Sequence, residues 1–193
     1  LEEKLSGMLK KIPAGPPYNN KKEAYTPAKS SFSSTQKEFA TNYIQGITGA
    51  PLPGTPDFNA YQLAMAIFSS KHFLEVRSKN GLSYAPNAWF ASGTTSVTNI
   101  AVSTTEPDKY INVFNGLVTK MKKEGFSPEE VQNEKVSYVT GVYYRQETND
   151  AQASALVNNE VQFGNWKRAL TIKDEIYKVT PEQVNAAFKK YMG

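Results

Sequence analysis

The chain has 193 residues, of which 39% are hydrophobic and 12% aromatic, and it contains no cysteine. This composition can form a hydrophobic core, which excludes wholesale disorder, and the lack of cysteine excludes disulfides, thiolate metal sites and cysteine nucleophiles. The formal net charge of +4 comes mainly from lysines in residues 1–40, so the rest of the chain is close to neutral. Without a basic stripe on the folded part, nucleic-acid binding is not expected.

The beginning of the chain predicts a short helix followed by a linker. Residues 3–11 are amphipathic, with Leu5, Met8 and Leu9 on one side. The segment that follows is rich in Pro, Asn, Ser and Lys and has few large aliphatic side chains, which is typical of a linker. We therefore divide the chain into a helix at 1–12, a linker at 13–35 and a folded domain at 36–193. The first residues lack an initiator Met and the apolar stretch of a signal peptide, so we expect the natural N-terminus to lie upstream.

The first half of the folded domain alternates strand and helix signals. Residues 38–47 read as a strand, and Thr55-Pro56-Asp57 predicts a helix start with Thr55 as the N-cap. Apolar residues leave this helix only a narrow polar face, so we expect it to be central and buried, and to continue to Lys79. Asn80-Gly81 would end it. Residues 83–91 and 96–105 read as two strands on a short turn, which makes them antiparallel.

The second half of the domain reads as helical. Pro107 opens a helix that closes at Gly125, and Ser127 to Glu130 forms a capping box for a helix that reaches the 140s. Further helices are expected at 151–163 and after Thr180. The longest unbroken apolar run covers only residues 63–68, far short of the roughly 20 residues that a membrane span needs. The order of elements predicts an α+β fold, with an antiparallel sheet packed against several helices.

The chain offers no self-contained catalytic set. His72 is its single histidine, whereas zinc sites commonly need three or four His, Cys or carboxylate ligands, and a serine triad needs a histidine base. The string HFLEV at 72–76 matches four of the five positions of the zinc-peptidase pattern H-x-x-E-H. Val76 occupies the second ligand position, so we interpret His72 as a helix side chain at the edge of the core. No catalytic residue and no metal ligand is expected in this chain.

Residues 73–84 read FLEVRSKNGLSY, and this stretch resembles the signature F-x-E-V-R-x-x-x-G-L-x-Y of the insulinase-type (pitrilysin-like) zinc metallopeptidases. Residues 40–46 resemble the opening strand of the second half of these enzymes, and residues 5–16 the last helix of the preceding half. The resemblance covers nearly the whole chain, although only residues 73–84 are specific. Two departures concern Ile67 to Ser70, where the family often has glycines, and the end of the chain, where the family has a further strand.

The resemblance implies one half of a clamshell metallopeptidase. In this family the first half binds zinc through H-x-x-E-H, and the second half contributes an Arg and a Tyr that bind substrate across the chamber. The matching residues here are Arg77 and Tyr84. The cofactor would be zinc held by the other half, and the partners would be that zinc-bearing N-terminal half, on the same chain or another, and a peptide substrate. The compartment stays open, with the bacterial periplasm as a working guess.

Residue types alone also allow a different interpretation of this pair. Arg77 could pair with Glu75 or another carboxylate, and Tyr84 could simply pack on the sheet. A cation and a phenol opposite a metal would instead stabilise the negative charge that develops on a peptide carbonyl oxygen during hydrolysis, or hold neighbouring carbonyls. The two interpretations differ in one geometric respect. Substrate binding requires both side chains on one open surface.

Two other functions remain open at this stage. Domains of this kind also serve as non-catalytic scaffold or partner subunits, and an upstream or neighbouring H-x-x-E-H sequence would favour the peptidase over the scaffold. A basic adaptor acting through the lysine-bearing tail is the third hypothesis. It predicts that deleting residues 1–34 abolishes binding to an acidic partner.

Overall fold

A computed structural model describes residues 2–16, 21–27 and 29–192. Its sheet has three antiparallel strands in the order β1-β3-β2: β1 (Asn42–Gly49), β3 (Val97–Thr104) and β2 (Asn87–Ala91). Asn42 pairs with Thr104 at one end of β3, and Trp89 pairs with Asn99 on its other side. Alternate residues of β3, such as Ile100 and Val102, are buried on the face that meets the helices. The predicted α+β class and antiparallel sheet are confirmed.

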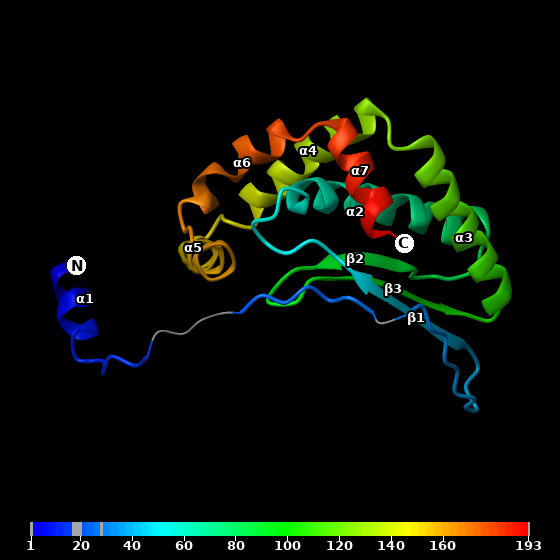
Figure 1. Ribbon diagram of the computed structural model, residues 1–193, viewed down its shortest axis with the longest axis horizontal. Helices are drawn as coiled ribbons and strands as arrows, with labels where there is room; N and C mark the ends of the chain where they lie inside the picture. The colour runs from blue at the N-terminus through cyan, green and yellow to red at the C-terminus, as the bar shows by residue number, and fades with distance from the viewer. Residues whose placement is uncertain (1, 17–20, 28, 193) are drawn as a thin grey trace.

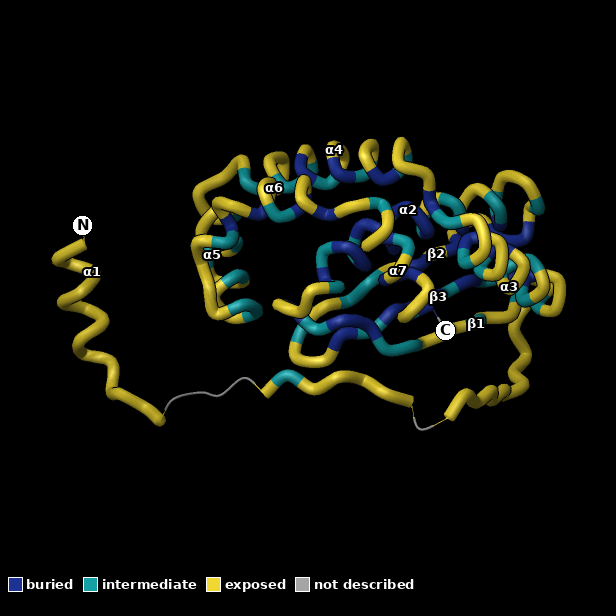
Figure 2. The backbone as a smooth tube through the Cα atoms, turned by 45° about the horizontal axis from the view of Figure 1, so that its top comes forward, coloured by how far each residue is buried: buried dark blue, intermediate teal, exposed yellow. Residues whose placement is uncertain are grey.

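The helices that follow β1 lie on one side of the sheet (Figure 1). Among them, α2 (Phe58–Phe73) lies between the strands and the outer helices. The helices that pack around α2 are α4 (Pro128–Tyr144), α6 (Arg168–Lys178) and α7 (Pro181–Tyr191). Apolar side chains lie on almost every side of α2, and Tyr61, Leu63 and Phe68 have no exposed surface. A helix that is hydrophobic all round must be enclosed. Figure 2 shows this buried centre inside an exposed shell.

The structure corrects three of the predicted boundaries. The first strand, predicted at 38–47, begins only at Asn42 and ends at Gly49. Thr55 is not the N-cap of α2, because its hydroxyl donates to the Leu52 carbonyl at 2.8 Å and the helix begins at Phe58. Asp57 occupies the N-cap position without a capping hydrogen bond, and its carboxylate instead accepts from Lys190 at 2.6 Å and Tyr191 at 3.0 Å. These bonds tie the start of α2 to the end of α7. The second strand starts at Asn87, four residues later than expected.

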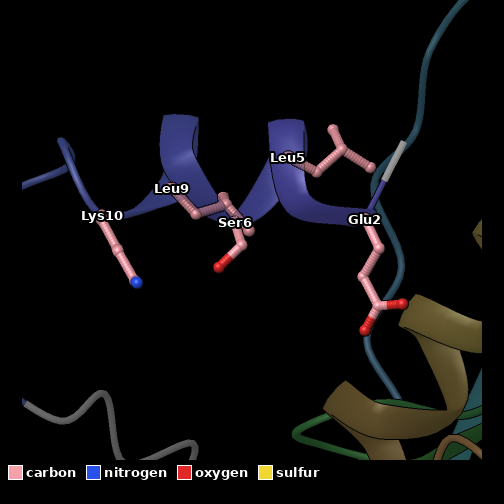
Figure 3. Close-up of a pocket in the computed structure, with 5 residues that line it drawn as sticks. All are labelled: Glu2, Leu5, Ser6, Leu9 and Lys10. Carbon is pink, nitrogen blue, oxygen red and sulfur yellow. The ribbon is translucent and has the colours of Figure 1, made fainter.

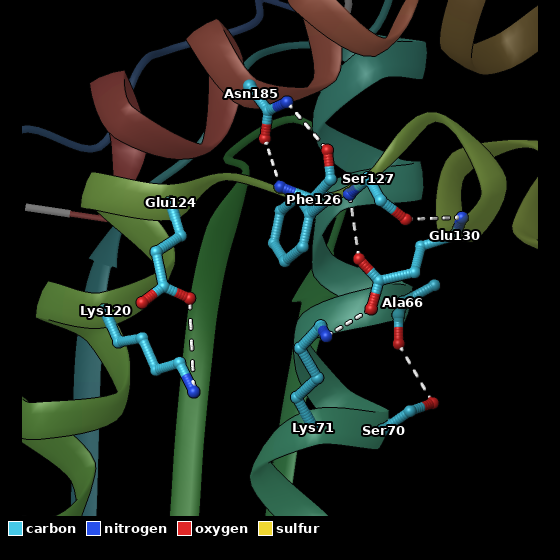
Figure 4. A network of polar contacts seen from close by, with 9 residues as sticks. All are labelled: Ala66, Ser70, Lys71, Lys120, Glu124, Phe126, Ser127, Glu130 and Asn185. Carbon is cyan, nitrogen blue, oxygen red and sulfur yellow. Dashed lines mark hydrogen bonds and ion pairs between the residues drawn. The ribbon is translucent and has the colours of Figure 1, made fainter.

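The junction between α3 (Pro107–Glu124) and α4 is held from the far end of the chain (Figure 4). Ser127 and Glu130 form the predicted capping box of α4. The side-chain amide of Asn185, in α7, accepts from the backbone N–H of Phe126 at 2.7 Å and donates to its carbonyl at 3.1 Å. Lys71, near the end of α2, forms an ion pair with Glu130. Helix α7 is therefore bonded to the loop between α3 and α4, and α2 to the first turn of α4.

Of the two helices at the end of the helix layer opposite this junction, only the first was predicted from the sequence. Helix α5 (Asn149–Phe163) follows the predicted segment, whereas α6 was not predicted as a separate element. The Arg168 guanidinium joins them to α2. It donates to Glu175 at 2.9 Å, to Asn159 at 3.2 Å and to Asn59 at 2.8 Å. A largely buried arginine with three acceptors is a structural cross-link.

The first helix, α1 (Glu2–Leu9), stands apart from this body, and none of its residues is buried. Between α1 and the sheet the described chain has no regular structure. It nevertheless contacts the body, because Glu23 donates its N–H to the Thr94 carbonyl at 2.8 Å and Lys22 donates to the Gln162 carbonyl. No helix among the described residues is long and apolar enough to cross a membrane.

The Asn185 contact yields a stability prediction. Replacing Asn185 with Ala removes two hydrogen bonds and leaves the Phe126 N–H and carbonyl without their partner, which should lower the free energy of unfolding by about 2 kcal/mol. Urea titration followed by circular dichroism measures this difference. Asn133→Ala, at an exposed position of α4, is the matched control and should change the value by no more than about 0.5 kcal/mol. Equal effects of the two substitutions would contradict the prediction.

Candidate functional site

The segment that bears Arg77 is a π-helix, η1 (Leu74–Lys79), which continues directly from α2. Its end follows the pattern expected for Asn80-Gly81. Gly81, at φ +61°, donates its N–H to the Arg77 carbonyl at 3.1 Å, and Leu82 donates to the Val76 carbonyl at 2.9 Å. These two nested bonds each span one residue more than the bonds of a Schellman cap, and they close the segment through a left-handed residue, a conformation that glycine adopts without strain. We refer to this end as the glycine cap. The cap reverses the chain immediately after Arg77.

A small hydrophobic cluster fixes this reversal in place. Val76 has no exposed surface and packs with Leu82, Val102 and Tyr110, all of which are buried. Hydrophobic contact between the residues on either side of the cap commonly accompanies helix ends of this left-handed type. Because Val76 points inward, its neighbour Arg77 emerges at the surface, where it is only partly buried.

The Arg77 guanidinium rests on aromatic rings. Its central carbon lies 4.0 Å from the centre of the Tyr84 ring and 5.2 Å from that of the Phe73 ring. Both distances lie within the range of cation–π attraction. The chain reversal at Gly81 therefore brings residues 77 and 84 together on one surface, as substrate binding requires. The predicted alternative for Tyr84 is wrong, since 79% of this side chain is exposed and it lies in the loop before β2.

Arg77 has no acidic partner within the described part of the chain. Glu75, the carboxylate considered for it, instead bonds to Lys79 at 2.8 Å, one helical turn further on. The chain has two other arginines. Arg168 is cross-linked to three acceptors, and Arg145 is exposed at the C-cap of α4. Arg77 alone combines a fixed position with hydrogen-bond donors that no described residue occupies.

Phe73 was missed as part of this site by reasoning from the sequence. The signal was present, because residues four apart lie on the same side of a helix, and Phe73 and Arg77 have this spacing. Its side chain is 38% exposed, and Leu74 beside it is 53% exposed. The surface around the guanidinium is therefore apolar and aromatic.

His72 is not at the edge of the core, as the sequence suggested, but fully buried. Its Nε2 lies 3.0 Å from the Tyr110 hydroxyl, and its ring packs against Phe68 and Phe114. Burial lowers the pKa of His72 to about 4, because the charged ring would lose its hydration. Glu75 lies on the surface with Lys79, so the residues of the HFLEV string do not converge. The described residues contain no group of three or more His, Cys, Asp or Glu that could hold a metal ion.

Comparison with known proteins identifies the fold. The family model described as "Peptidase M16 inactive domain" matches residues 1–138. A conserved protein from Enterococcus faecalis V583 superimposes with a TM-score of 0.80 at 15% identity, over 99% of this chain and 47% of that one. An inactive peptidase domain of a zinc protease from Bordetella parapertussis superimposes with a TM-score of 0.70 at 15% identity, over 83% of this chain and 91% of that one. The periplasmic protease PqqL from Escherichia coli superimposes with a TM-score of 0.73 at 14% identity, over 100% of this chain and 23% of that one. No curated protein matches the chain in sequence.

The burial of His72 predicts an unusual titration. The folded state favours the neutral ring, whereas the unfolded chain takes up a proton near the ordinary pKa of 6.5. The stability contributed by the neutral ring is complete above pH 6.5 and is lost as the pH falls toward 4. The free energy of unfolding should thus decrease by about 2 kcal/mol between pH 7.5 and pH 5.

A chain with one histidine makes this measurement unambiguous. The Cε1–H signal of His72 in an NMR titration should stay constant from pH 8 to pH 5, and His72→Phe should flatten the decline in unfolding free energy over the same range. A titration midpoint near 6.5 in the folded protein would show that the ring is hydrated and the assignment wrong.

Proposed function

The chain belongs to the M16 peptidase inactive-domain family, and we propose that it is the substrate-binding, non-catalytic half of a zinc-dependent endopeptidase. One observation carries the proposal. The Arg77 guanidinium is held on the Tyr84 ring, on an apolar surface, with no acceptor among the described residues. An arginine used only for stability would be expected to pair with a carboxylate, as Arg168 does with Glu175.

The proposed role follows from the chemistry of these two side chains. A guanidinium presents several N–H donors in one plane, and a phenol adds one O–H donor. Backbone carbonyls of an extended peptide could accept from both groups. Negative charge grows on the scissile carbonyl oxygen during hydrolysis, so a fixed cation nearby binds the transition state more tightly than the substrate.

The remaining parts of the enzyme would come from another half. Zinc is the implied cofactor, and because the described residues include no fitting donor set, the other half would hold it while Arg77 and Tyr84 act on the peptide. The chain spans 47% of the Enterococcus faecalis protein and 23% of PqqL, which leaves room in those proteins for further domains. We assign residues 36–193 to the substrate-binding domain and residues 13–35 to the linker.

Helix α1 provides a second contact with that other half in this proposal. Leu5 and Leu9 are one helical turn apart on the same face of α1, and each is about half exposed or more. The shallow surface around Leu5 and Leu9 is lined by residues 2–10 alone, with no second element closing it (Figure 3). An isolated helix of eight residues is marginal in water. We infer that residues 1–12 end the preceding half and are covered by it.

Substitutions at the Arg77–Tyr84 surface test the proposed function. The chain is combined with the zinc-bearing half encoded upstream or by a neighbouring gene, and cleavage of an unstructured fluorogenic peptide is followed. Arg77→Ala should lower kcat/KM by about 100-fold, as expected for removing one donor to a developing oxyanion. Tyr84→Phe should lower it by about tenfold, as expected for losing one hydrogen bond.

Matched controls exist for both substitutions. Arg145→Ala and Tyr144→Phe change the same residue types at exposed positions remote from residues 77 and 84, and should leave cleavage unchanged. Urea titration separates any loss of activity from a loss of stability. Wild-type cleavage by both site variants would refute the assigned roles. Absence of cleavage with any zinc-bearing half would favour the scaffold function.

The covering of α1 has its own test. Leu5→Ser and Leu9→Ser together should weaken association with the zinc-bearing half by about tenfold or more, since each removes a large apolar side chain from the proposed interface. The free energy of unfolding of the present chain should not change, because neither residue is buried in it. Isothermal titration calorimetry and urea titration measure the two quantities. Unchanged association would contradict the interface.

A further inference from the structure

The π-helical turn that carries Arg77 needs support from outside itself. A π-turn is less favourable than the α-helix it interrupts, and it commonly occurs where function requires a particular side-chain direction. Within η1, only Val76 is buried. The glycine cap at Gly81 fixes the end of the segment. Its beginning, where α2 gives way to η1, requires a separate anchor.

One side chain from α3 contacts the segment on both sides of this transition. The Tyr110 hydroxyl bonds to Nε2 of His72, two residues before η1 begins. The ring of the same tyrosine packs in the cluster with Val76, inside η1, and Leu82, beyond it. Tyr110 is 2% exposed and His72 is not exposed at all. The hydroxyl and the ring of Tyr110 thus connect three points along the chain reversal.

The bond between the His72 ring and the Tyr110 hydroxyl is the one polar contact that orients these two side chains among the described residues. His72 Nδ1 is buried and has no hydrogen-bond partner within the described residues, so Nε2 makes the one polar contact of the ring. The surroundings are aromatic, with Phe68 stacked on the imidazole and Phe114 edge-on to it. Aromatic packing alone permits sliding and rotation, whereas a hydrogen bond has a defined length and direction.

We propose that His72 and Tyr110 are positioning residues, whose buried hydrogen bond sets the register of the π-helical turn and thereby holds the Arg77 guanidinium against the Tyr84 ring. Neither residue touches the peptide. The significance of the arrangement for catalysis rests on the function proposed above, but its effect on Arg77 can be measured without any substrate.

The test uses three variants and one control. Tyr110→Phe and His72→Phe each remove one partner of the bond, and the double variant replaces both with rings of similar shape. Tyr61→Phe is the matched control, because Tyr61 is also fully buried on α2 and its hydroxyl bonds to buried Thr98. It lies about three helical turns from His72.

The first readout is the NMR shift of the Arg77 side-chain protons, which the ring current of Tyr84 displaces upfield while the two groups are stacked. Tyr84→Leu supplies the shift of an unstacked Arg77. Tyr110→Phe and His72→Phe should move the Arg77 signals toward this reference, and Tyr61→Phe should leave them at the wild-type position. Urea titration of the same proteins reports stability.

The double variant separates positioning from stability. Replacing both partners of a buried hydrogen bond with apolar groups is often nearly neutral, so its free energy of unfolding should return close to wild type. The Arg77 signals should nevertheless remain at the unstacked position. Wild-type Arg77 shifts in the double variant would overturn the proposal, as would an equal displacement in Tyr61→Phe.

Cleavage by the double variant with the zinc-bearing half then distinguishes the two proposals. An approximately tenfold loss of kcat/KM, with Arg77 unstacked, supports both. Full activity with Arg77 unstacked supports positioning but removes the proposed role of Arg77 in catalysis. Reduced activity with Arg77 still stacked overturns the positioning role and leaves the proposed function standing.

Discussion

The fold depends on burying α2. Nine of its 16 residues are buried, and they are distributed around the helix rather than along one side. Such a helix cannot lie at a protein surface, so the sheet must cover it from one side and α4, α6 and α7 from the others. The polar contacts follow from this enclosure. Asp57 bonds to the end of α7, Asn59 to Arg168, and Lys71 to Glu130, and each joins α2 to a covering helix at its margin.

The candidate site lies where this enclosed helix leaves the core. At His72 the chain is still fully buried, and five residues later Arg77 has reached the surface. The change happens through a π-turn with Val76 pointing inward and the glycine cap at Gly81. The preceding helix cannot move without disturbing the core. Its packing therefore fixes the point from which the turn bearing Arg77 starts. Residues of the sheet enter through buried Val102 of β3 and partly buried Ile44 of β1, in and against the cluster beneath the turn.

The elements that could be predicted from the sequence are those with local causes. Gly81 ends the segment, Ser127 and Thr180 cap their helices, and the strands are antiparallel because the turn between them is short. Predictions failed where a distant residue decides. The sequence did not predict that the Asp57 carboxylate binds Lys190 and Tyr191, because no local pattern can reveal partners more than 130 residues away. The Thr55 cap, by contrast, was wrong for a local reason, the bond from its hydroxyl to the Leu52 carbonyl. The burial of His72 likewise depends on a helix that follows later in the chain.

The candidate site likewise has features that the local sequence predicts and features that depend on distant residues. Arg77 and Tyr84 were identified from a signature, and the competition between Lys79 and Arg77 for Glu75 could have been resolved from helical spacing, since residues four apart face each other and residues two apart do not. The stacking of Arg77 on Tyr84 could not. It depends on where the loop after Leu82 places the tyrosine ring, and therefore on the cluster of Val76, Leu82, Val102 and Tyr110.

The choice of aromatic rings to hold Arg77 has an electrostatic consequence. A carboxylate partner would fix the guanidinium equally well, but it would neutralise the charge and occupy the N–H donors in the plane of the group. A ring below that plane attracts the cation through its face and leaves the edge of the guanidinium available. The same arrangement would be poor for lysine, whose charge is compact and strongly hydrated. The geometry at residues 77 and 84 therefore combines two properties that usually oppose each other, a fixed position and unused hydrogen-bonding capacity, and this combination is what binding a peptide carbonyl requires.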